Sequence, residues 1–583
     1  MVIKKWPVAI YFLVISITQT YGQDAKINAF KYEITKNIIC KKGAVVSAHA
    51  LASQVGVSIL QQGGNAVDAA IATQLALAVV YPGAGNIGGG GFMIAHLKNY
   101  GQPNGHGKNI ALDYREKAPA AATRDMYLDS NGNPQQGLSL DGHLSVGIPG
   151  TIAGLFASMK YAKLSFKKLI QPAIVLADNG FVITESQAES FNNNRDDFIK
   201  LNTSNPVFVK ENLWKKGDTL IQKDLTRTLK RIRDFGMKGF YEGETAKLIV
   251  AEMQRGKGLS AGQGGIITYN DLKNYKAKER TPDTFNYKGH TIVTMPLPSS
   301  GGIILQQMLK MIEKKNIGAM KFQTAQSVQL MTEAERRAFA DRAQFLGDPD
   351  FVKVPVKTLV SDEYLTKRMH DYQPLIAGNS NDIKAGEINI ESEETTHLSV
   401  MDNKGNAVSV TTTLNNSYGS KTVVTGAGFL LNDEMDDFSV KPGVPNLYGA
   451  IGNEANAIAP GKRMLSSMTP TIVLKNKQPY LVIGSPGGTT IPTSVFQTIV
   501  NVIDFKLSTD DAVNKPKFHH QWLPDRIDVE KDFPQIVIDE LKKMGYKINV
   551  RESIGRTEVI KVLPGKKLEA VADKRGDDAA VGW

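Results

Sequence analysis

Cysteine is almost absent from this chain, because Cys40 is the only one among 583 residues. A protein with one cysteine cannot form an internal disulfide. Cys40 does not directly follow the apolar segment near the N-terminus, where a lipid-attachment cysteine would stand. We therefore interpret it as a buried, inert thiol.

Concentrated charge and long apolar runs are also missing. The net charge of +11 is spread along the sequence, without a basic block or an aromatic-interleaved basic stripe, which disfavours nucleic-acid binding. No segment provides the roughly 20 apolar residues that a stable membrane span needs. With 42% hydrophobic and 22% charged residues, the composition is typical of a soluble globular protein. The length favours two lobes or one large layered domain.

The N-terminus has the order of a secretory signal peptide. Lys4 and Lys5 precede an apolar run that ends near Ile17, and Thr20 and Gly22 stand at the −3 and −1 positions of a cleavage site. The alternative is an uncleaved anchor, but the run is too short for one. We expect residues 1–22 to be removed and the protein to be exported, either to a periplasm or out of the cell.

Helical and strand-like patterns alternate along the chain. Residues 48–81 predict two helices joined by "GGN", with Asn65 as the cap of a deeply buried second helix. Residues 155–390 are mostly helical, and Ser299 and Ser300 in "MPLPSSGG" are interpreted as helix caps. After Thr395, short alternating strands dominate before helical spacing returns. This order predicts a layered α/β arrangement.

The segment "GAGNIG" (83–88) matches the G-x-G-x-x-G dinucleotide pattern in letters only. That fingerprint needs a strand before it and a helix after it. Here a helix precedes and a strand-like segment follows. We interpret it as a close-packed, glycine-rich turn.

The sequence "TTHLSVMDNKGNAVSVTTTLN" predicts a β-hairpin whose register can be deduced. Gly405 supplies the left-handed position of a three-residue loop, so Asp402 pairs with Asn406. Val400 then opposes Val408, and Leu398 opposes Val410, on an apolar face. Ser399 opposes Ser409, His397 opposes Thr411, and Thr395 opposes Thr413 on a polar face.

The hairpin has two possible roles. Threonine is a weak nucleophile unless it begins a chain, where its own α-amine, with a pKa of about 7.7–8.0, can act as base. Such chemistry at Thr395 requires a cut after Glu394, which attack by the Thr395 hydroxyl on the Glu394 carbonyl would make. The alternative is an ordinary hairpin with a solvent-exposed polar face.

The surrounding motifs resemble those of γ-glutamyltranspeptidase, a family of secreted N-terminal nucleophile hydrolases. "GGNAVDAA", "GNIGGGGFM", "LDYREKAPAAATRDM" and "LGDPDFVKVP" are similar to the large subunit of that family. "TTHLSV", "LNDEMDDFSVKPGVPN", "MLSSMTPTIV", "GSPGG" and "FHHQWLPD" are similar to the small subunit. The similarity keeps the same order from about residue 35 to 580.

The resemblance implies a four-layer αββα sandwich of the N-terminal nucleophile hydrolase type, made by two subunits from one precursor. Self-cleavage before Thr395 would give a large subunit of residues 23–394 and a small subunit of residues 395–583. The two would form a heterodimer.

The resemblance also implies the roles of the site residues. Thr395 is the nucleophile, Thr413 supports it, and Gly487 and Gly488 supply the oxyanion-hole amides. Arg115, Ser466 and Ser467 bind the α-carboxylate of the γ-glutamyl group. Its ammonium is bound by Asn415, Glu434 and Asp437. Residue 434 is glutamine in some relatives, and glutamate adds a negative charge near the ammonium.

The implied substrates are glutathione and other γ-glutamyl compounds, with water, amino acids or short peptides as acceptors. No metal or organic cofactor is needed, and His519 and His520 in "FHHQW" are interpreted as structural. The segment "FSVKPGVPNLYG" resembles a lid, and the loop near 255–265 is longer than the usual turn of the family. Two alternatives remain: a glutaryl- or cephalosporin-type acylase of the same superfamily, and an exported binding protein without catalysis.

Overall fold

The structure is a computed structural model that describes residues 27–98, 100, 107–135, 137–256, 264–383, 395–441 and 453–583. Some predictions concern residues outside these ranges: the signal peptide, Glu394 and the bond that follows it, most of the long loop near 255–265, and most of the lid segment. Within the described ranges, no helix is long and apolar enough to cross a membrane.

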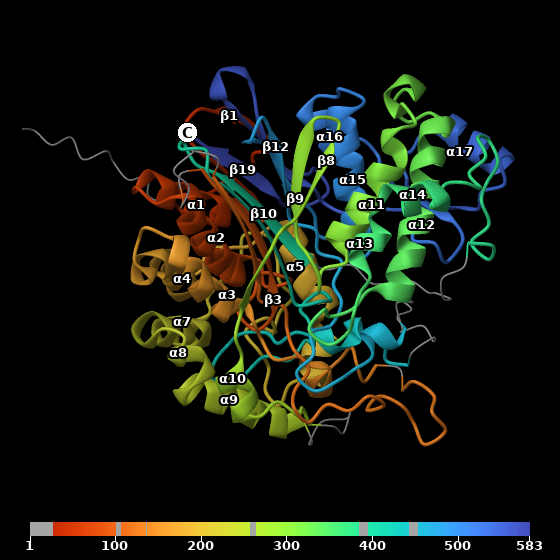
Figure 1. Ribbon diagram of the computed structural model, residues 1–583. Helices are drawn as coiled ribbons and strands as arrows, with labels where there is room; N and C mark the ends of the chain where they lie inside the picture. The colour runs from red at the N-terminus through yellow and green to blue at the C-terminus, as the bar shows by residue number, and fades with distance from the viewer. Residues whose placement is uncertain are drawn as a thin grey trace, which may run out of the picture.

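Two seven-stranded sheets, counted over the described residues, pack against each other in the middle of the molecule (Figure 1). The first sheet is antiparallel and contains, in spatial order, β19 (Ala579–Gly582), β2 (Ala44–Ser47), β10 (Thr395–Met401), β11 (Ala407–Thr413), β3 (Gly90–Leu97), β4 (Lys108–Asp113) and β7 (Lys278–Arg280). The predicted hairpin therefore lies between β2 and β3, and the C-terminal strand β19 pairs with β2 at the edge of the sheet.

The second sheet is also antiparallel. It contains β1 (Asn37–Cys40), β18 (Leu568–Val571), β17 (Glu558–Val562), β13 (Gln478–Gly484), β12 (Thr471–Lys475), β9 (His290–Thr294) and β8 (Asp283–Tyr287). An apolar cluster that includes Val46, Phe92, Ile472 and Val482 fills the space between the two sheets.

Helices cover the outer face of each sheet (Figure 1). On the side of the first sheet lie α1 (Ala50–Gln61), α2 (Ala66–Val80), α3 (Thr151–Ser158), α4 (Phe166–Asn179), α5 (Glu185–Asn193), α6 (Arg195–Lys200), α7 (Lys223–Phe235), α8 (Lys238–Tyr241), α9 (Gly243–Arg255) and α10 (Tyr269–Asn274). On the side of the second sheet lie α11 (Gly301–Glu313), α12 (Ala325–Phe345), α13 (Val356–Leu359), α14 (Asp362–Arg368), α15 (Thr490–Ile503), α16 (Thr509–Asn514) and α17 (Gln535–Lys543). Shorter strands complete the description: β5 (Phe181–Val182), β6 (Thr219–Leu220), β14 (Phe518–His519), β15 (Ile527–Glu530) and β16 (Ile548–Arg551).

The helix pair at 48–81 forms as the sequence predicts. Asn65 caps α2 and makes a capping box with Asp68, and every residue of α2 is buried. The glycine-rich turn joins α2 to strand β3, so it lies between a helix and a strand, as expected. A side chain at Gly85 would collide with the Leu77 carbonyl, and one at Gly88 would collide with the Leu430 carbonyl. The glycines are needed for close packing.

The β10–β11 hairpin has the predicted register at every pair. Gly405 has a φ of +81°, as the three-residue loop requires. The apolar face joins the core beneath α2, which contains Leu398, Val400 and Val408. The polar face is also buried, because it points to the second sheet: the Ser409 hydroxyl donates to the Ile483 carbonyl at 2.9 Å. The alternative of a solvent-exposed polar face is therefore wrong.

Candidate active site

Thr395 is the first residue of β10, a central strand of the first sheet. Its side chain is 5% exposed, and it pairs with Thr413, the last residue of β11. Both residues lie on the polar face of the hairpin, between the two sheets. A hydroxyl group is thus held at the end of a rigid strand pair, where its position varies little.

His397 organises the same polar face behind Thr395. Its Nδ1 lies 2.9 Å from the Thr411 hydroxyl, and its Nε2 lies 3.1 Å from the Ser399 hydroxyl. Burial lowers the pKa of His397 to about 3, so the ring is neutral at working pH. Gly484 of the facing sheet makes room for this ring, because a Cβ there would lie 2.2 Å from it.

The segment after Thr413 turns sharply and is tied to an acidic segment. The backbone N–H of Asn415 donates to the Thr413 hydroxyl at 2.8 Å, and Asn415 has a φ of +79°. The Asn415 side chain donates to the Asp433 carbonyl at 3.2 Å. The backbone N–H and the side-chain Nδ2 of Asn416 both donate to the Asp433 carboxylate. These bonds bring Asn415 close to the residues that follow Asp433.

One small cavity collects nearly all the predicted site residues, and we call it the Thr395 cavity. It is lined by Arg115, Thr395, Thr413, Asn415, Glu434, Asp437, Ser466, Ser467, Met468, Gly488 and Ile491. Its volume is about 20 Å³, which is room for roughly one water molecule. Among the predicted site residues that the structure describes, only Gly487 is missing from this lining. It lies in the wall of the neighbouring cavity.

Arg115 forms the charged centre of the Thr395 cavity. Its guanidinium forms ion pairs with Glu434 and Asp437, and its Nη1 lies 3.3 Å from the Glu116 carboxylate. Arg115, Glu116 and Glu434 are each about 1% exposed or less. One cation therefore faces three carboxyl groups inside the protein. A ligand that carries its own ammonium would favour the ionised form of these acids.

Burial changes the proton affinity of these acids. Burial raises the pKa of Glu116 to about 7, although Arg115 opposes the change. Burial likewise raises the pKa of Glu434 well above its usual range, against the effect of Arg115. The Oε2 atom of Glu434 forms the ion pair with Arg115, yet neither carboxyl oxygen of Glu434 accepts a well-aligned hydrogen bond from the described residues. Glu434 thus keeps acceptor capacity for a cationic ligand.

Ser466 and Ser467 are held in place by hydrogen bonds from Ser300, at the N-cap of α11, and Arg342, in α12. Arg342 donates from Nη2 to the Ser467 hydroxyl at 3.2 Å and from Nε to the Ser300 hydroxyl at 3.1 Å. Ser300 donates to the Ser466 carbonyl at 2.7 Å. Because a guanidinium only donates, the Ser467 oxygen is an acceptor here and its proton is available for an anion.

The interpretation of Ser299 and Ser300 as helix caps was incomplete. Ser300 occupies the N-cap of α11 without a side-chain capping bond. Ser299 accepts from the Gly301 amide at 3.1 Å and donates to the Met468 carbonyl at 2.5 Å. Both hydroxyls mainly fix the segment that contains Ser466 and Ser467.

The "GSPGG" segment forms a tight turn at the start of α15. Gly487 has a φ of +125° and Gly488 a φ of +50°, which are conformations that favour glycine. The Gly487 carbonyl accepts from the Thr490 amide at 2.9 Å and from the Thr490 hydroxyl at 2.6 Å. A Cβ at Gly487 would lie 2.4 Å from the Thr490 hydroxyl. The turn therefore keeps its backbone close to the cavity.

Sequence reasoning missed several polar residues that support the site. Asn86, inside the glycine-rich turn, donates to the Thr413 carbonyl at 2.8 Å and accepts from the Thr151 hydroxyl at 2.7 Å. Asn432 accepts from the Glu434 amide at 3.1 Å and donates to the Gly88 carbonyl at 2.9 Å. Their only signals in the sequence were their positions inside the family-like motifs "GNIGGGGFM" for Asn86 and "LNDEMDD" for Asn432.

His519 and His520 are buried and bonded to neighbouring protein groups. His519 lies 2.9 Å from the Thr493 hydroxyl and 2.9 Å from the Gln521 side chain. His520 accepts from the Trp522 amide at 3.0 Å. In the described part of the chain, no group of three or more histidine, cysteine or acidic side chains has the arrangement of a metal site.

Comparison with known families and proteins gives a consistent result. The model of the family described as Gamma-glutamyltranspeptidase matches residues 52–583. The "Glutathione hydrolase proenzyme" of Escherichia coli (strain K12) is 46% identical over 548 residues, which cover 93% of this chain and 92% of that protein.

Solved structures add the fold. The crystal structure of a cephalosporin acylase from Bacillus halodurans matches with a TM-score of 0.80 and 26% identity, covering 95% of this chain and 98% of that one. The Helicobacter pylori gamma-glutamyltranspeptidase matches with a TM-score of 0.55 and 42% identity, covering 61% of this chain and 97% of that one. The acylase structure therefore shares nearly the whole fold, and the transpeptidase structure shares the part of the fold that its match covers.

Proposed function

Because the chain belongs to the gamma-glutamyltranspeptidase family and is an enzyme of the glutathione hydrolase type, we propose that it cleaves the γ-glutamyl amide of glutathione and related compounds. The γ-glutamyl group passes to water or to the amine of an amino acid or short peptide. The observation that carries this proposal is the lining of the Thr395 cavity, where Arg115, Glu434 and Asp437 surround a strand-terminal threonine.

Maturation begins with a self-cleavage. The Thr395 hydroxyl attacks the Glu394 carbonyl, the peptide nitrogen leaves as the new α-amine of Thr395, and water hydrolyses the resulting ester. The products are a large subunit of residues 23–394 and a small subunit of residues 395–583. They remain together as a heterodimer with the αββα architecture of N-terminal nucleophile hydrolases. The two central sheets support this assembly, because each contains strands from both fragments.

Catalysis uses the new terminus. The α-amine of Thr395 takes the proton of its hydroxyl, the oxygen attacks the γ-carbonyl, and the proton passes to the departing amine. Thr413 orients the nucleophile across the strand pair. The amides of Gly487 and Gly488 donate to the oxygen that becomes negative in the transition state. No metal or organic cofactor takes part.

Recognition depends on the two charges of the γ-glutamyl group. Its α-carboxylate binds the fork of Arg115 and the hydroxyls of Ser466 and Ser467, for which bidentate geometry is well suited. Its ammonium binds Asn415, Glu434 and Asp437. Binding exchanges the internal ion pairs of Arg115 for pairs with the ligand. The cavity must widen for this, since about 20 Å³ does not hold a glutamyl group.

A second candidate function is that of a glutaryl- or cephalosporin-type acylase, which the similarity to the Bacillus halodurans acylase structure favours. A glutaryl group has a carboxylate but no ammonium. Glu434 and Asp437 would then have no ligand ammonium to bind, and they would compete with the glutaryl carboxylate for Arg115. This competition disfavours the acylase.

The test compares γ-glutamyl-p-nitroanilide with glutaryl-p-nitroanilide on the matured enzyme. We expect kcat/KM to be about 10- to 150-fold higher for the γ-glutamyl compound, since a charge-assisted bond in a buried site contributes about 1.5–3 kcal/mol. Equal or reversed rates would favour the acylase. Binding of γ-glutamyl compounds without turnover, by a chain that never divides, would instead identify a binding protein.

Export completes the proposal. Residues 1–22 direct the chain across a membrane, and the enzyme then acts in a periplasm or outside the cell. Mass spectrometry of the large fragment tests this proposal, because removal of the signal peptide predicts a chain that begins at residue 23.

A further inference from the structure

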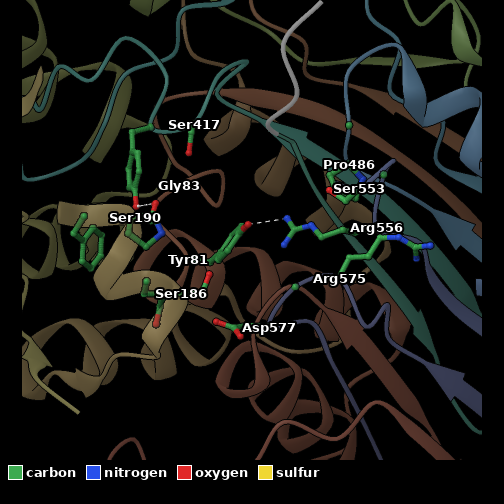
Figure 2. A pocket seen from close by; sticks show the side chains of 17 residues that line it. Tyr81, Gly83, Ser186, Ser190, Ser417, Pro486, Ser553, Arg556, Arg575 and Asp577 are labelled. Carbon is green, nitrogen blue, oxygen red and sulfur yellow. Dashed lines mark hydrogen bonds between the residues drawn. The ribbon is translucent and has the colours of Figure 1, made fainter. Parts of the chain in front are cut away.

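A second cavity lies on the other side of the glycine turn, and we call it the Arg556 cavity (Figure 2). Its volume is about 270 Å³, near the lower end of the roughly 300–1,000 Å³ typical of ligand sites. Its lining includes Tyr81, Ser190, Ser417, Gly487, Arg556 and Asp577. Most of these side chains carry hydroxyl or charged groups, so the cavity suits a small polar molecule.

The two cavities share two walls. In the glycine turn, Gly488 lines the Thr395 cavity and Gly487 lines the Arg556 cavity. In the segment after β11, Asn415 lines the first and Ser417 the second. A γ-glutamyl amide with its carbonyl at the turn and its glutamyl part in the Thr395 cavity therefore extends its amine part toward the Arg556 cavity.

Arg556 is the cation that faces this space. Its Nη2 donates to the Tyr81 hydroxyl at 2.7 Å, and its Nη1 lies 3.6 Å from the Asp578 carboxylate. Its backbone amide donates to the Ser485 hydroxyl at 3.0 Å, which ties it to the glycine turn. The side chain is 18% exposed. In Figure 2 its guanidinium reaches across the cavity toward Tyr81.

Arg575 also lines the cavity, but its guanidinium is bound to acidic side chains of the protein. Its guanidinium donates to both oxygens of Glu530 and to the Asp573 carboxylate at 2.8 Å. These bonds anchor the C-terminal segment. Arg556 is therefore the better placed of the two for a ligand.

We propose that the Arg556 cavity binds the amine partner of the reaction and that Arg556 holds the carboxylate of this partner. The inference rests on the proposed function. The cysteinylglycine that leaves glutathione and the amino acids or dipeptides that accept the glutamyl group share one chemistry, an amine and a carboxylate. In transfer, the acceptor nitrogen bonds to the carbonyl carbon of the Thr395 ester. The bond from that carbon to the Thr395 oxygen breaks, and a proton of the amine passes to that oxygen.

Asp577 adds selectivity to the same cavity. Its carboxylate accepts from the Thr184 hydroxyl at 2.5 Å and is part of the lining. Across from Arg556, it repels a second negative charge. Acceptors with acidic side chains are therefore expected to bind less tightly than neutral or basic ones.

The experiment compares two acceptors that differ only in the carboxylate, glycylglycine and glycylglycinamide, with γ-glutamyl-p-nitroanilide as donor. Concentrations are expressed as unprotonated amine, because removing the carboxylate changes the amine pKa. We expect the wild-type KM for glycylglycine to be at least about tenfold lower than for the amide. Arg556→Gln should abolish this preference, and Arg556→Lys should keep part of it.

The control is Arg227→Gln, which removes an exposed arginine of α7 that pairs only with Asp224 among the described residues. It should leave the acceptor preference unchanged. Equal wild-type KM values for the two acceptors would overturn the proposal, as would an equal loss for both in Arg556→Gln. If Arg556→Gln fails to mature, the wild-type comparison and Arg556→Lys still decide. A wild-type enzyme that releases no p-nitroaniline would overturn the proposed function itself.

Discussion

The Thr395 cavity has a volume of about 20 Å³ and centres on Arg115 and its acidic partners Glu434 and Asp437, whereas the Arg556 cavity has a volume of about 270 Å³ and is lined by six hydroxyl side chains, two arginines and one aspartate, among other residues. The first is suited to a ligand with one carboxylate and one ammonium at a fixed separation. Without a ligand, Arg115 forms ion pairs with Glu434 and Asp437 instead. The second can accept amines of varied shape, provided that they carry a carboxylate. The difference indicates strict selection of the donor and loose selection of the acceptor.

The largest expected effect comes from removing Thr395, the proposed nucleophile. Thr395→Ala should abolish the chain cut and reduce turnover by at least about 10⁴-fold, because no other group can form the ester. A denaturing gel and p-nitroaniline release measure the two results. The control is Thr396→Val: the Thr396 hydroxyl is buried without a hydrogen-bond partner among the described residues, so losing it should be tolerated. Turnover in a Thr395→Ala preparation would show that Thr395 is not the nucleophile.

A smaller effect should separate the cavities. Arg115→Lys removes the planar fork and leaves a single ammonium among Glu116, Glu434 and Asp437. We expect kcat/KM to fall about 10²- to 10³-fold for every γ-glutamyl donor, whatever its leaving amine. The acceptor preference for a carboxylate should persist. An effect that depended on the leaving amine would contradict the division of tasks between the cavities.

Loss of the hydrogen bond between Arg342 and Ser467 should have an intermediate effect on the donor KM. Arg342→Met leaves the Ser467 hydroxyl without its guanidinium donor, so its proton is no longer directed at the donor carboxylate. We expect the donor KM to rise about tenfold with a smaller change in kcat. Ser467→Ala should raise the donor KM similarly, and the double variant should be little worse than either, because both substitutions remove the bond between Arg342 and Ser467. Fully additive losses would show that Arg342 acts by another route.

The smallest effect concerns Glu116 and depends on pH. Burial raises the pKa of Glu116 to about 7, so its carboxyl is neutral below this pH and charged above it. Glu116→Gln is neutral throughout. Its donor kcat/KM should therefore equal that of the wild type below pH 6 and fall about three- to tenfold behind at pH 8, where the wild type has an additional negative charge for the ammonium.

The raised pKa of Glu116 also predicts how the free energy of unfolding changes with pH. Between its unfolded pKa of about 4.3 and its folded pKa of about 7, the folded state holds more protons on Glu116, so stability falls as pH rises. Glu116→Gln removes this loss and should gain stability relative to the wild type from pH 5 to pH 8. A constant difference in thermal midpoint across that range would contradict a raised pKa.

Local sequence patterns predicted the hairpin well. Its register follows from the alternation of valines with serines and threonines and from one left-handed glycine, all within about 20 residues. The capping box of α2 is equally local, since Asn65 and Asp68 are three residues apart. Such features need no knowledge of the rest of the chain.

Long-range features could not be predicted from these residues alone. Arg115 and Asp437 pair across 322 residues of sequence, and Arg342 reaches Ser467 across 125. Resemblance to a family identified Arg115, Asp437 and Ser467, but it did not point to Arg342 or Glu116. Arg556 also escaped notice, because its proposed role depends on a cavity formed by six separate segments of the chain. The burial of the hairpin's polar face likewise required the second sheet.

The central claim is that a new N-terminus at Thr395 performs the chemistry. N-terminal sequencing of the smaller fragment, taken from a preparation with measured turnover, tests it most directly. We predict a sequence that begins Thr-Thr-His-Leu-Ser at Thr395 and a fragment of 189 residues. A fully active preparation whose chain remains uncut, or whose fragment begins at any other residue, would contradict the account.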